Sequence, residues 1–245
     1  EMRDKMMPLF KRMHDMWPDH AHEEVHLLAI AGSTMLFEAL AVSETWRDWY
    51  RSNDQTPWYA YMKRILQMLQ FRGGQGERWV LKSPQHLEQF EPLLRTFPDA
   101  CFAVTHRDPL AITASFATMS AYSSRLSRDP VDAVRVGQYW SDRIETMLGS
   151  CVRDRHLLPE DQSMDVLFHE FMDDEMGMVE RIYALAGQPL TSDSRRAMQE
   201  FVDEHPRGMH GRVAYDLADF DIDAGERREK LAPYVERFGI RLEDF

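Results

Sequence analysis

The stretch that decides the fold is residues 78–115, which read RWVLKSPQHLEQFEPLLRTFPDACFAVTHRDPLAITAS. It contains two apolar runs, 78–82 and 101–106, that have the length and continuity of buried strands. Each run is followed by a segment with helical spacing, 85–96 and 109–122. Because strands that alternate with helices form parallel βαβ units, this stretch predicts an α/β fold in which helices flank a parallel sheet.

The two strand-to-helix corners of this stretch are built alike. Each has a basic residue at the end of the apolar run, Lys82 or Arg107, followed by a helix-capping residue, Ser83 or Asp108, and then by a proline. Parallel strands end at the same edge of a sheet, and ligands of open α/β sheets bind outside that edge. Two cations beside helix N-termini there predict an anion-binding site. The alternative is that they are surface cations beside ordinary loops.

Outside this stretch the pattern is mostly helical, with a third expected strand at 164–168. We interpret the whole chain, 1–245, as one helix-rich domain. Helices over 1–72 form its cap, and 78–245 form its α/β core and C-terminal helices. The further helices are expected at 2–16, 22–40, 43–52, 57–71, 130–156, 174–187, 191–204 and 223–238.

Composition limits the classes of function. The chain has 245 residues, 44% of them hydrophobic, and no apolar run reaches the roughly 18 residues that a membrane span needs. Its formal net charge of −12 argues against a nucleic-acid partner, because binding to a phosphate backbone depends on clustered Lys and Arg. The two cysteines, Cys101 and Cys151, exclude a disulfide framework and favour a cytoplasmic location. A homodimer is compatible with the sequence.

The central stretch resembles the sulfotransferase family that uses 3′-phosphoadenosine 5′-phosphosulfate (PAPS). The resemblance is carried by LKSPQH at 81–86, FPDA at 97–100 and HRDPLAITAS at 106–115, and more weakly by VLFHEF at 166–171. It implies the sulfotransferase version of the P-loop nucleotide-kinase fold. It also implies an enzyme that moves a sulfuryl group from PAPS to a hydroxyl or amine of a small molecule, lipid or glycan, without a metal, and that releases adenosine 3′,5′-bisphosphate.

The resemblance also implies roles for three residues of the two corners. Arg107 and Ser115 correspond to the pair that binds the 3′-phosphate of the cofactor, and a guanidinium and a hydroxyl are chemically suited to that task. Lys82 corresponds to a lysine near the sulfuryl group and its bridging oxygen. An ammonium held there would stabilise the negative charge that grows on the leaving oxygen.

Two further residues beside Lys82 belong to the candidate site. Ser83 is included among the cofactor-binding residues, and His86 is the candidate base for the acceptor hydroxyl, because imidazole titrates near neutral pH. Many relatives carry their base two residues after the lysine, where this chain has Pro84. A histidine at the start of a helix that only caps or packs is an equally weighted alternative.

The resemblance is weakest at the two phosphate-binding loops. Arg207, Gly208 and Arg212 resemble the late loop that covers the nucleotide phosphates, although a solvated turn is an equal alternative. The glycine- and hydroxyl-rich loop that binds the 5′-phosphosulfate is not found within the sequence, and neither is a P-loop motif. We expect that loop and its strand to precede residue 1. If they are lost, the protein is a pseudoenzyme that binds a nucleotide or a partner.

A second motif predicts a different chemistry. Residues 22–26 read HEEVH, which matches the HExxH pattern of zinc hydrolases. The motif lies at the first turn of its expected helix, and Ala29 and Gly32 do not continue the extended form of the pattern. A polar helix start is therefore favoured over a zinc site, and we expect no metal ligand in the functional site.

Overall fold

Among the residues that the structure describes, two strands form a parallel sheet. The computed structural model describes residues 5–14, 22–73, 76, 78–206, 208–211 and 213–244. Strand β1 (Phe102–His106) pairs in parallel with β2 (Ser163–Leu167), and Phe102 lies opposite Ser163. Helices connect the strands and surround them, as the βαβ pattern of the sequence predicts.

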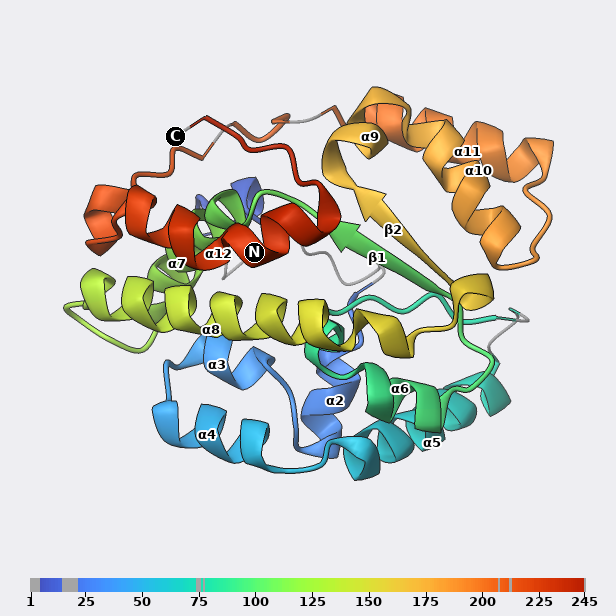
Figure 1. Ribbon diagram of the computed structural model, residues 1–245, viewed down its shortest axis with the longest axis horizontal. Helices are drawn as coiled ribbons and strands as arrows, with labels where there is room; N and C mark the ends of the chain where they lie inside the picture. The colour runs from blue at the N-terminus through green and yellow to red at the C-terminus, as the bar shows by residue number, and fades with distance from the viewer. Residues whose placement is uncertain are drawn as a thin grey trace.

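The helices are arranged around a long central helix, α8 (Figure 1). In that view α12 lies above α8, helices α2 to α6 lie below it, and α9 to α11 lie beyond β2. The α-helices are α2 (Val25–Ala31), α3 (Leu36–Leu40), α4 (Glu44–Ser52), α5 (Thr56–Phe71), α6 (Phe90–Thr96), α7 (Pro109–Ser124), α8 (Ala133–Asp154), α9 (Phe168–Asp173), α10 (Glu175–Leu185), α11 (Ser192–Glu204) and α12 (Ala224–Phe238). The short 3₁₀ helices are η1 (Phe10–Arg12), η2 (Pro84–Glu88), η3 (Arg155–Leu157), η4 (Glu160–Gln162) and η5 (Leu217–Phe220).

One face of α8 forms the middle of the hydrophobic core. Val136, Trp140, Ile144, Met147 and Cys151 recur at intervals of three or four residues, so they lie on one side of the helix. All of them are buried, and they pack in one cluster with side chains of β1, α12 and the helices before residue 72. The apolar face of α8 therefore joins the N-terminal helices to the sheet.

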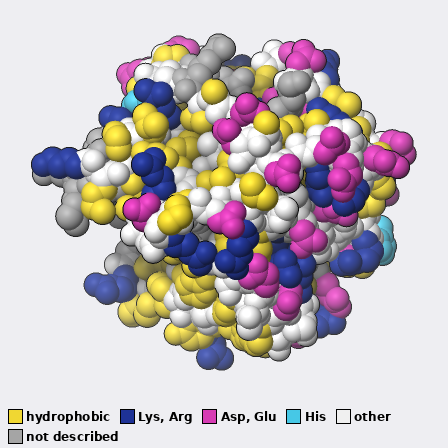
Figure 2. All heavy atoms as spheres, turned by 90° about the vertical axis from the view of Figure 1, so that its left-hand side faces the viewer, with side chains coloured by type: hydrophobic (Ala, Val, Ile, Leu, Met, Phe, Trp, Pro, Cys, Tyr) yellow, Lys and Arg dark blue, Asp and Glu magenta, His cyan; other side chains and the backbone are white. Residues whose placement is uncertain are grey.

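A buried ion-pair network makes a second connection between these regions. The guanidinium of Arg143 in α8 donates to Glu38 of α3 at 3.0 Å and to Glu88 of η2 at 2.8 Å. The hydroxyl of Tyr139 also donates to Glu38, at 2.6 Å. Arg143 and Glu38 are completely buried, so each charge depends on its partner. At the surface, by contrast, basic and acidic side chains are interspersed on the face shown in Figure 2.

The expected strand at 78–82 is wrong. Among the described residues the sheet contains only β1 and β2, and residues 78–82 belong to no strand. Val80, expected to be buried, is 94% exposed. The N–H of Lys82 donates to the carboxylate of Glu24 at 2.6 Å, where a strand would donate to a neighbouring carbonyl. The corner at Lys82 is therefore held by a side chain and not by a sheet.

Two of the expected helices are divided. The helix expected at 22–40 is interrupted at Gly32, whose φ of 93° ends α2 in a left-handed cap before α3 begins. The helix expected at 85–96 is the 3₁₀ helix η2 followed by α6. The expected helix at 2–16 lies partly outside the described residues, and its described part contains η1. The other expected helices are present within a few residues of their predicted bounds as α4, α5, α7, α8, α10, α11 and α12.

Candidate functional site

The corner after β1 has the structure that the sequence predicts. Arg107 follows the last residue of the strand, and Asp108 is the N-cap of α7. The carboxylate of Asp108 accepts a hydrogen bond of 2.9 Å from the N–H of Leu110, and Pro109 occupies the first helical position. Arg107 therefore stands at the carboxyl end of a parallel strand and beside a helix N-terminus, which is the usual location of an anion site in an α/β fold.

The guanidinium of Arg107 is bound by a carboxylate near the end of the chain. Its Nε and Nη2 donate to the two oxygens of Glu243 at 2.6 Å and 2.7 Å. These hydrogen bonds raise the pKa of Arg107, although partial burial opposes the shift. On the other side, Cζ of Arg107 lies 4.4 Å from the centre of the Phe168 ring. These three residues line a pocket of about 270 Å³ at the end of the sheet.

Ser115 lies on the same helix as the Arg107 corner. Its hydroxyl donates to the hydroxyl of Tyr215 at 3.4 Å. Tyr215, in the segment before η5, also acts electrostatically on the pKa of Arg107. Tyr215 thus bonds Ser115 and lies within electrostatic range of Arg107, and a ligand shared by Arg107 and Ser115 stays a prediction.

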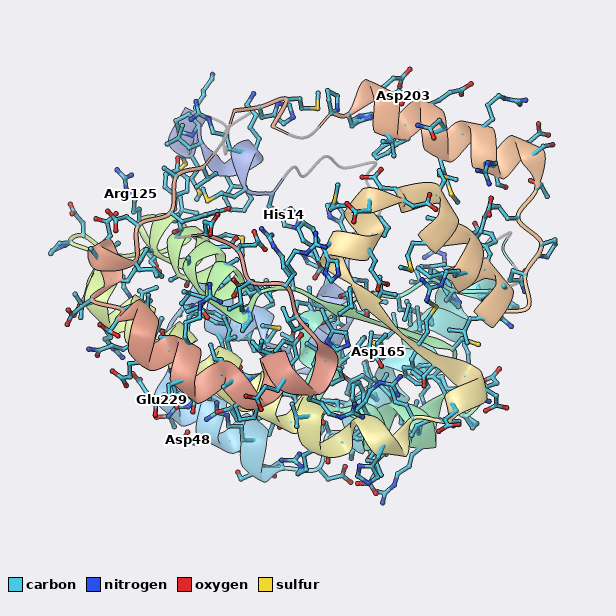
Figure 3. The ribbon with its side chains drawn as sticks, turned by 45° about the horizontal axis from the view of Figure 1, so that its top comes forward. His14, Asp48, Arg125, Asp165, Asp203 and Glu229 are labelled. Carbon is cyan, nitrogen blue, oxygen red and sulfur yellow. The ribbon has the colours of Figure 1, made fainter. Side chains whose placement is uncertain are left out.

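A buried polar network supports the strand end that carries Arg107. His106 is 2% exposed, and its ring nitrogens bond Asp165 at 2.9 Å and the Tyr234 hydroxyl at 2.8 Å. Asp165, labelled in Figure 3, also accepts from Nε of Arg155 at 2.8 Å. Burial raises the pKa of Asp165, but the hydrogen bonds from His106 and Arg155 outweigh it and lower the pKa to about 2. The carboxylate therefore links β2 to the end of β1.

The corner at Lys82 is organised by two adjacent glutamates. Glu24 binds Lys82 and His86: one carboxylate oxygen accepts from the Lys82 N–H and the other bonds Nε2 of His86. Glu23 forms an ion pair with the Lys82 ammonium. The other ring nitrogen of His86, Nδ1, lies 2.8 Å from the hydroxyl of Tyr59. Lys82 and His86 are thus brought together, as the sequence predicts, by residues that the sequence assigned to another motif.

The neighbours of His86 determine where its proton lies. Burial raises the pKa of Glu24, but hydrogen bonds from His86 and Lys82 outweigh it, so the pKa lies below its ordinary value. Burial raises the pKa of Tyr59 well above its ordinary value. A carboxylate only accepts and a neutral phenol can donate, so we assign the hydrogen to Nε2 of His86 and the lone pair to Nδ1.

Ser83 does not cap the following helix. It occupies the N-cap position of η2, but its side chain accepts no capping hydrogen bond, which corrects the sequence prediction. Its hydroxyl is buried and has no hydrogen-bond partner among the described residues. The helix that follows is a 3₁₀ helix of five residues, in which the N–H of His86 bonds the Ser83 carbonyl at 3.2 Å. The Ser83 hydroxyl is therefore an unpartnered polar group next to Lys82 in the sequence.

The two glutamates of the HEEVH stretch, Glu23 and Glu24, bind Lys82 and His86. Helix α2 begins only at Val25, so His22 and His26 are not both on a helix, and their ring centres lie 5.7 Å apart. Nδ1 of His26 bonds the backbone carbonyl of Glu23 at 3.1 Å. Within the described part of the chain, no group of three or more His, Cys, Asp or Glu residues is placed to hold a metal ion.

The late basic loop is only partly described. Arg207 and Arg212 lie outside the described residues. Gly208 has a φ of 75°, a left-handed conformation that favours glycine and that fits a tight turn. Its role in covering the nucleotide phosphates remains a prediction of the sequence.

The fold and the two corners define a helix-rich α/β protein in which an arginine at the end of the parallel sheet binds a carboxylate of its own chain. A family model described as the sulfotransferase family matches residues 1–193, and the chain belongs to this family. No curated protein sequence matches the chain. None of the described helices is long and apolar enough to cross a membrane.

Two solved sulfotransferases from mycobacteria have similar structures. Sulfotransferase STF9 from Mycobacterium avium is 26% identical, with a TM-score of 0.80, and the match covers 94% of this chain and 59% of that chain. Sulfotransferase STF1 from Mycobacterium tuberculosis H37Rv is also 26% identical, with a TM-score of 0.75 and coverage of 93% and 62%. The chain therefore spans about three-fifths of the length of these structures.

Proposed function

We propose that the protein transfers a sulfuryl group from PAPS to a hydroxyl or amine of a small molecule, lipid or glycan. The observation that carries this proposal is the pair of parallel hydrogen bonds that the Arg107 guanidinium donates to both oxygens of the Glu243 carboxylate. A guanidinium presents the same parallel donors to a phosphate. Membership of the sulfotransferase family makes the 3′-phosphate of PAPS the anion for which this arginine is suited.

The cofactor would be bound by both corners of the structure. Arg107 and Ser115 would bind the 3′-phosphate from β1 and α7, and Tyr215 stands beside both. The unpartnered hydroxyl of Ser83 would donate to the phosphosulfate end, next to Lys82. In the late loop, Arg207, Gly208 and Arg212 would cover the nucleotide phosphates. These roles need no metal ion.

The transfer step assigns a different task to Lys82. The acceptor oxygen attacks sulfur while the bond from sulfur to the bridging phosphate oxygen breaks, and adenosine 3′,5′-bisphosphate leaves with that electron pair. The ammonium of Lys82 stabilises the charge that grows on the leaving oxygen. The Lys82 side chain is 70% exposed, and its ion pair with Glu23 must break when the ammonium binds the cofactor.

The proton of the acceptor would reach His86 through the hydroxyl of Tyr59. Nδ1 of His86 carries the lone pair, but this nitrogen is already hydrogen-bonded to the Tyr59 hydroxyl, 2.8 Å away. The Tyr59 hydroxyl therefore gives its proton to Nδ1 while its oxygen takes the proton of the acceptor. The imidazolium that results lies against the carboxylate of Glu24, which stabilises its charge.

We propose the cytoplasm as the location of this reaction. Cys101 and Cys151 are both free thiols, as is usual in a reducing compartment. Cys151 is buried, and burial raises the pKa of its thiol to about 12, so it is an inert core residue.

A ligand pair that differs only in the 3′-phosphate tests the proposed cofactor. Adenosine 3′,5′-bisphosphate should raise the Tm of the full-length protein, because a ligand of the native state stabilises it. Adenosine 5′-monophosphate, which lacks the group that Arg107 would bind, should raise it much less. Equal shifts with both nucleotides would refute the assignment of Arg107, and binding without sulfuryl transfer to any acceptor would indicate a pseudoenzyme.

A further inference from the structure

Glu24 is a buried carboxylate at the centre of the Lys82 corner. The residue is 3% exposed and comes directly before α2. Its carboxylate reaches the N–H of Lys82 and Nε2 of His86, which lie 58 and 62 residues further along the chain. Neither hydrogen bond is part of a helix or a sheet. The contact therefore ties the N-terminal helices to the segment that carries both candidate catalytic side chains.

Burying this charge is costly, and the structure compensates for it completely. An ionised carboxylate removed from water must be paired and hydrogen-bonded to be tolerated. Both oxygens of Glu24 have such partners. Glu23, the adjacent carboxylate, is different: its side chain is 25% exposed and pairs with the exposed ammonium of Lys82. The two glutamates therefore act on the same corner in different ways.

We propose that Glu24 is the positioning residue of this corner, which fixes the backbone of Lys82 and holds the hydrogen of His86 on Nε2. The inference rests on the proposed sulfuryl transfer and deepens it. With the hydrogen on Nε2, the lone pair of Nδ1 faces the Tyr59 hydroxyl and is ready to receive a proton. Without that carboxylate, nothing in the described surroundings of Nε2 selects this tautomer.

The isosteric variant Glu24→Gln separates this role from simple packing. An amide has one accepting oxygen and one donating nitrogen, whereas Glu24 accepts at both oxygens. If the amide oxygen faces the Lys82 N–H, its NH₂ group faces Nε2 of His86 and forces the hydrogen onto Nδ1. If the amide is turned round, its NH₂ group faces the Lys82 N–H, and the repulsion of these two donors disfavours this arrangement relative to the first. Either arrangement leaves the shape of the side chain intact and disturbs the corner.

Two variants provide matched controls. Glu23→Gln removes the same charge from the neighbouring residue but leaves the contacts of Glu24, so the tautomer of His86 should not change. Glu24→Asp keeps a carboxylate that accepts at both oxygens and should restore part of the lost turnover. His86→Gln identifies the signals of His86 among those of the other histidines.

The experiment combines imidazole ¹⁵N NMR with single-turnover kinetics on the full-length protein. At neutral pH, wild type and Glu23→Gln should carry the hydrogen of His86 on Nε2, and Glu24→Gln should not. The turnover of Glu24→Gln at saturating PAPS should fall about 100-fold, as expected for a lost general base. Its Kd for adenosine 3′,5′-bisphosphate should change less than about threefold.

Three results would overturn the proposal. The first is a wild-type His86 with its hydrogen on Nδ1, which needs no variant and holds even if Glu24→Gln does not fold. The second is a Glu24→Gln protein that transfers sulfuryl groups at the wild-type rate. The third is the same tautomer change in Glu23→Gln. Failure of the proposed function would look different. Neither the wild type nor any variant would transfer sulfuryl groups, whether or not it binds adenosine 3′,5′-bisphosphate and whatever the tautomer of His86.

Discussion

Arg107 and Glu243 are joined by two parallel hydrogen bonds of 2.6 Å and 2.7 Å, so the arginine at the end of β1 already holds an anion from its own chain. The backbone of Glu243 is fixed as well. Its N–H donates to Asp108 at 2.7 Å, and its carbonyl accepts from Arg228 at 3.0 Å. In Figure 1, α12 ends beside the carboxyl end of β1, which brings this segment to the corner. A phosphate that binds Arg107 through the same donors must displace the carboxylate.

Glu243→Gln should therefore tighten the binding of adenosine 3′,5′-bisphosphate. The ion pair is more than one-third exposed on both sides, and such pairs contribute up to about 1 kcal/mol, so Kd should fall by about three- to fivefold. Calorimetric titration measures the change. Glu44→Gln, which removes an exposed partner of Arg135 elsewhere, should leave Kd unaltered. Weaker binding in Glu243→Gln would mean that the carboxylate orients Arg107 and does not compete with the ligand.

Tyr59→Phe tests the proton path to His86. The hydroxyl of Tyr59 is the group bonded to Nδ1, so its loss breaks the relay while the ring that packs in the core is kept. Turnover at saturating PAPS should fall at least about tenfold, with little change in the KM for PAPS. Single-turnover rates across a range of PAPS concentrations separate the two quantities. An unchanged or higher rate would show that His86 takes the proton directly once Nδ1 is uncovered.

Arg143→Met should destabilise the whole protein. It leaves the carboxylates of Glu38 and Glu88 buried without their common partner, and breaking such a pair typically costs about 3–5 kcal/mol. Arg135→Met removes an exposed ion pair and should cost less than about 1 kcal/mol. Urea unfolding of both variants gives the comparison. Equal losses would contradict the view that the Arg143 network joins the N-terminal helices to α8.

Asp165→Asn should alter the acid stability of the protein. The pKa of Asp165 falls from its ordinary 3.8 to about 2 in the folded state, because His106 and Arg155 bond its carboxylate more strongly than burial disfavours it. A lowered pKa stabilises the fold above the ordinary value, and this stabilisation is lost as the pH falls through the folded value. The free-energy difference between wild type and variant should be constant near neutral pH and shrink between about pH 4 and pH 2. A difference independent of pH would contradict the assignment.

Local rules explain what the sequence could predict. The cap, the proline and the basic residue at the Arg107 corner are adjacent in sequence, and their conformations follow from short-range sterics and hydrogen bonds. The apolar repeat of α8 is likewise a property of one segment. For this reason the α/β class and most helices could be anticipated. The pairing of Arg107 with Ser115 came from the resemblance to the sulfotransferase family and not from these local rules.

Long-range pairing explains what the sequence could not predict. A strand at 78–82 needs a neighbouring strand, and the apolar residues of a segment do not indicate whether such a neighbour is present. The partners of Lys82 and His86 come from about 60 residues upstream, at Glu23 and Glu24. There the residue pattern suggested a metal motif. The available signal was two adjacent acidic residues directly before an apolar helix, and this pattern does not identify their partners.

The most direct test of the central claim is calorimetric titration of adenosine 3′,5′-bisphosphate into wild type, Arg107→Ala and Lys82→Ala, beside their single-turnover rates with PAPS. Arg107→Ala should raise Kd about 10- to 100-fold, because a charge-assisted contact to the 3′-phosphate is lost, and saturating PAPS should recover part of its rate. Lys82→Ala should bind within about threefold of wild type and turn over slowly even when saturated, because its charge acts mainly in the transition state. An Arg107→Ala protein that binds as tightly as wild type would contradict the phosphate site, and with it the sulfuryl-transfer account.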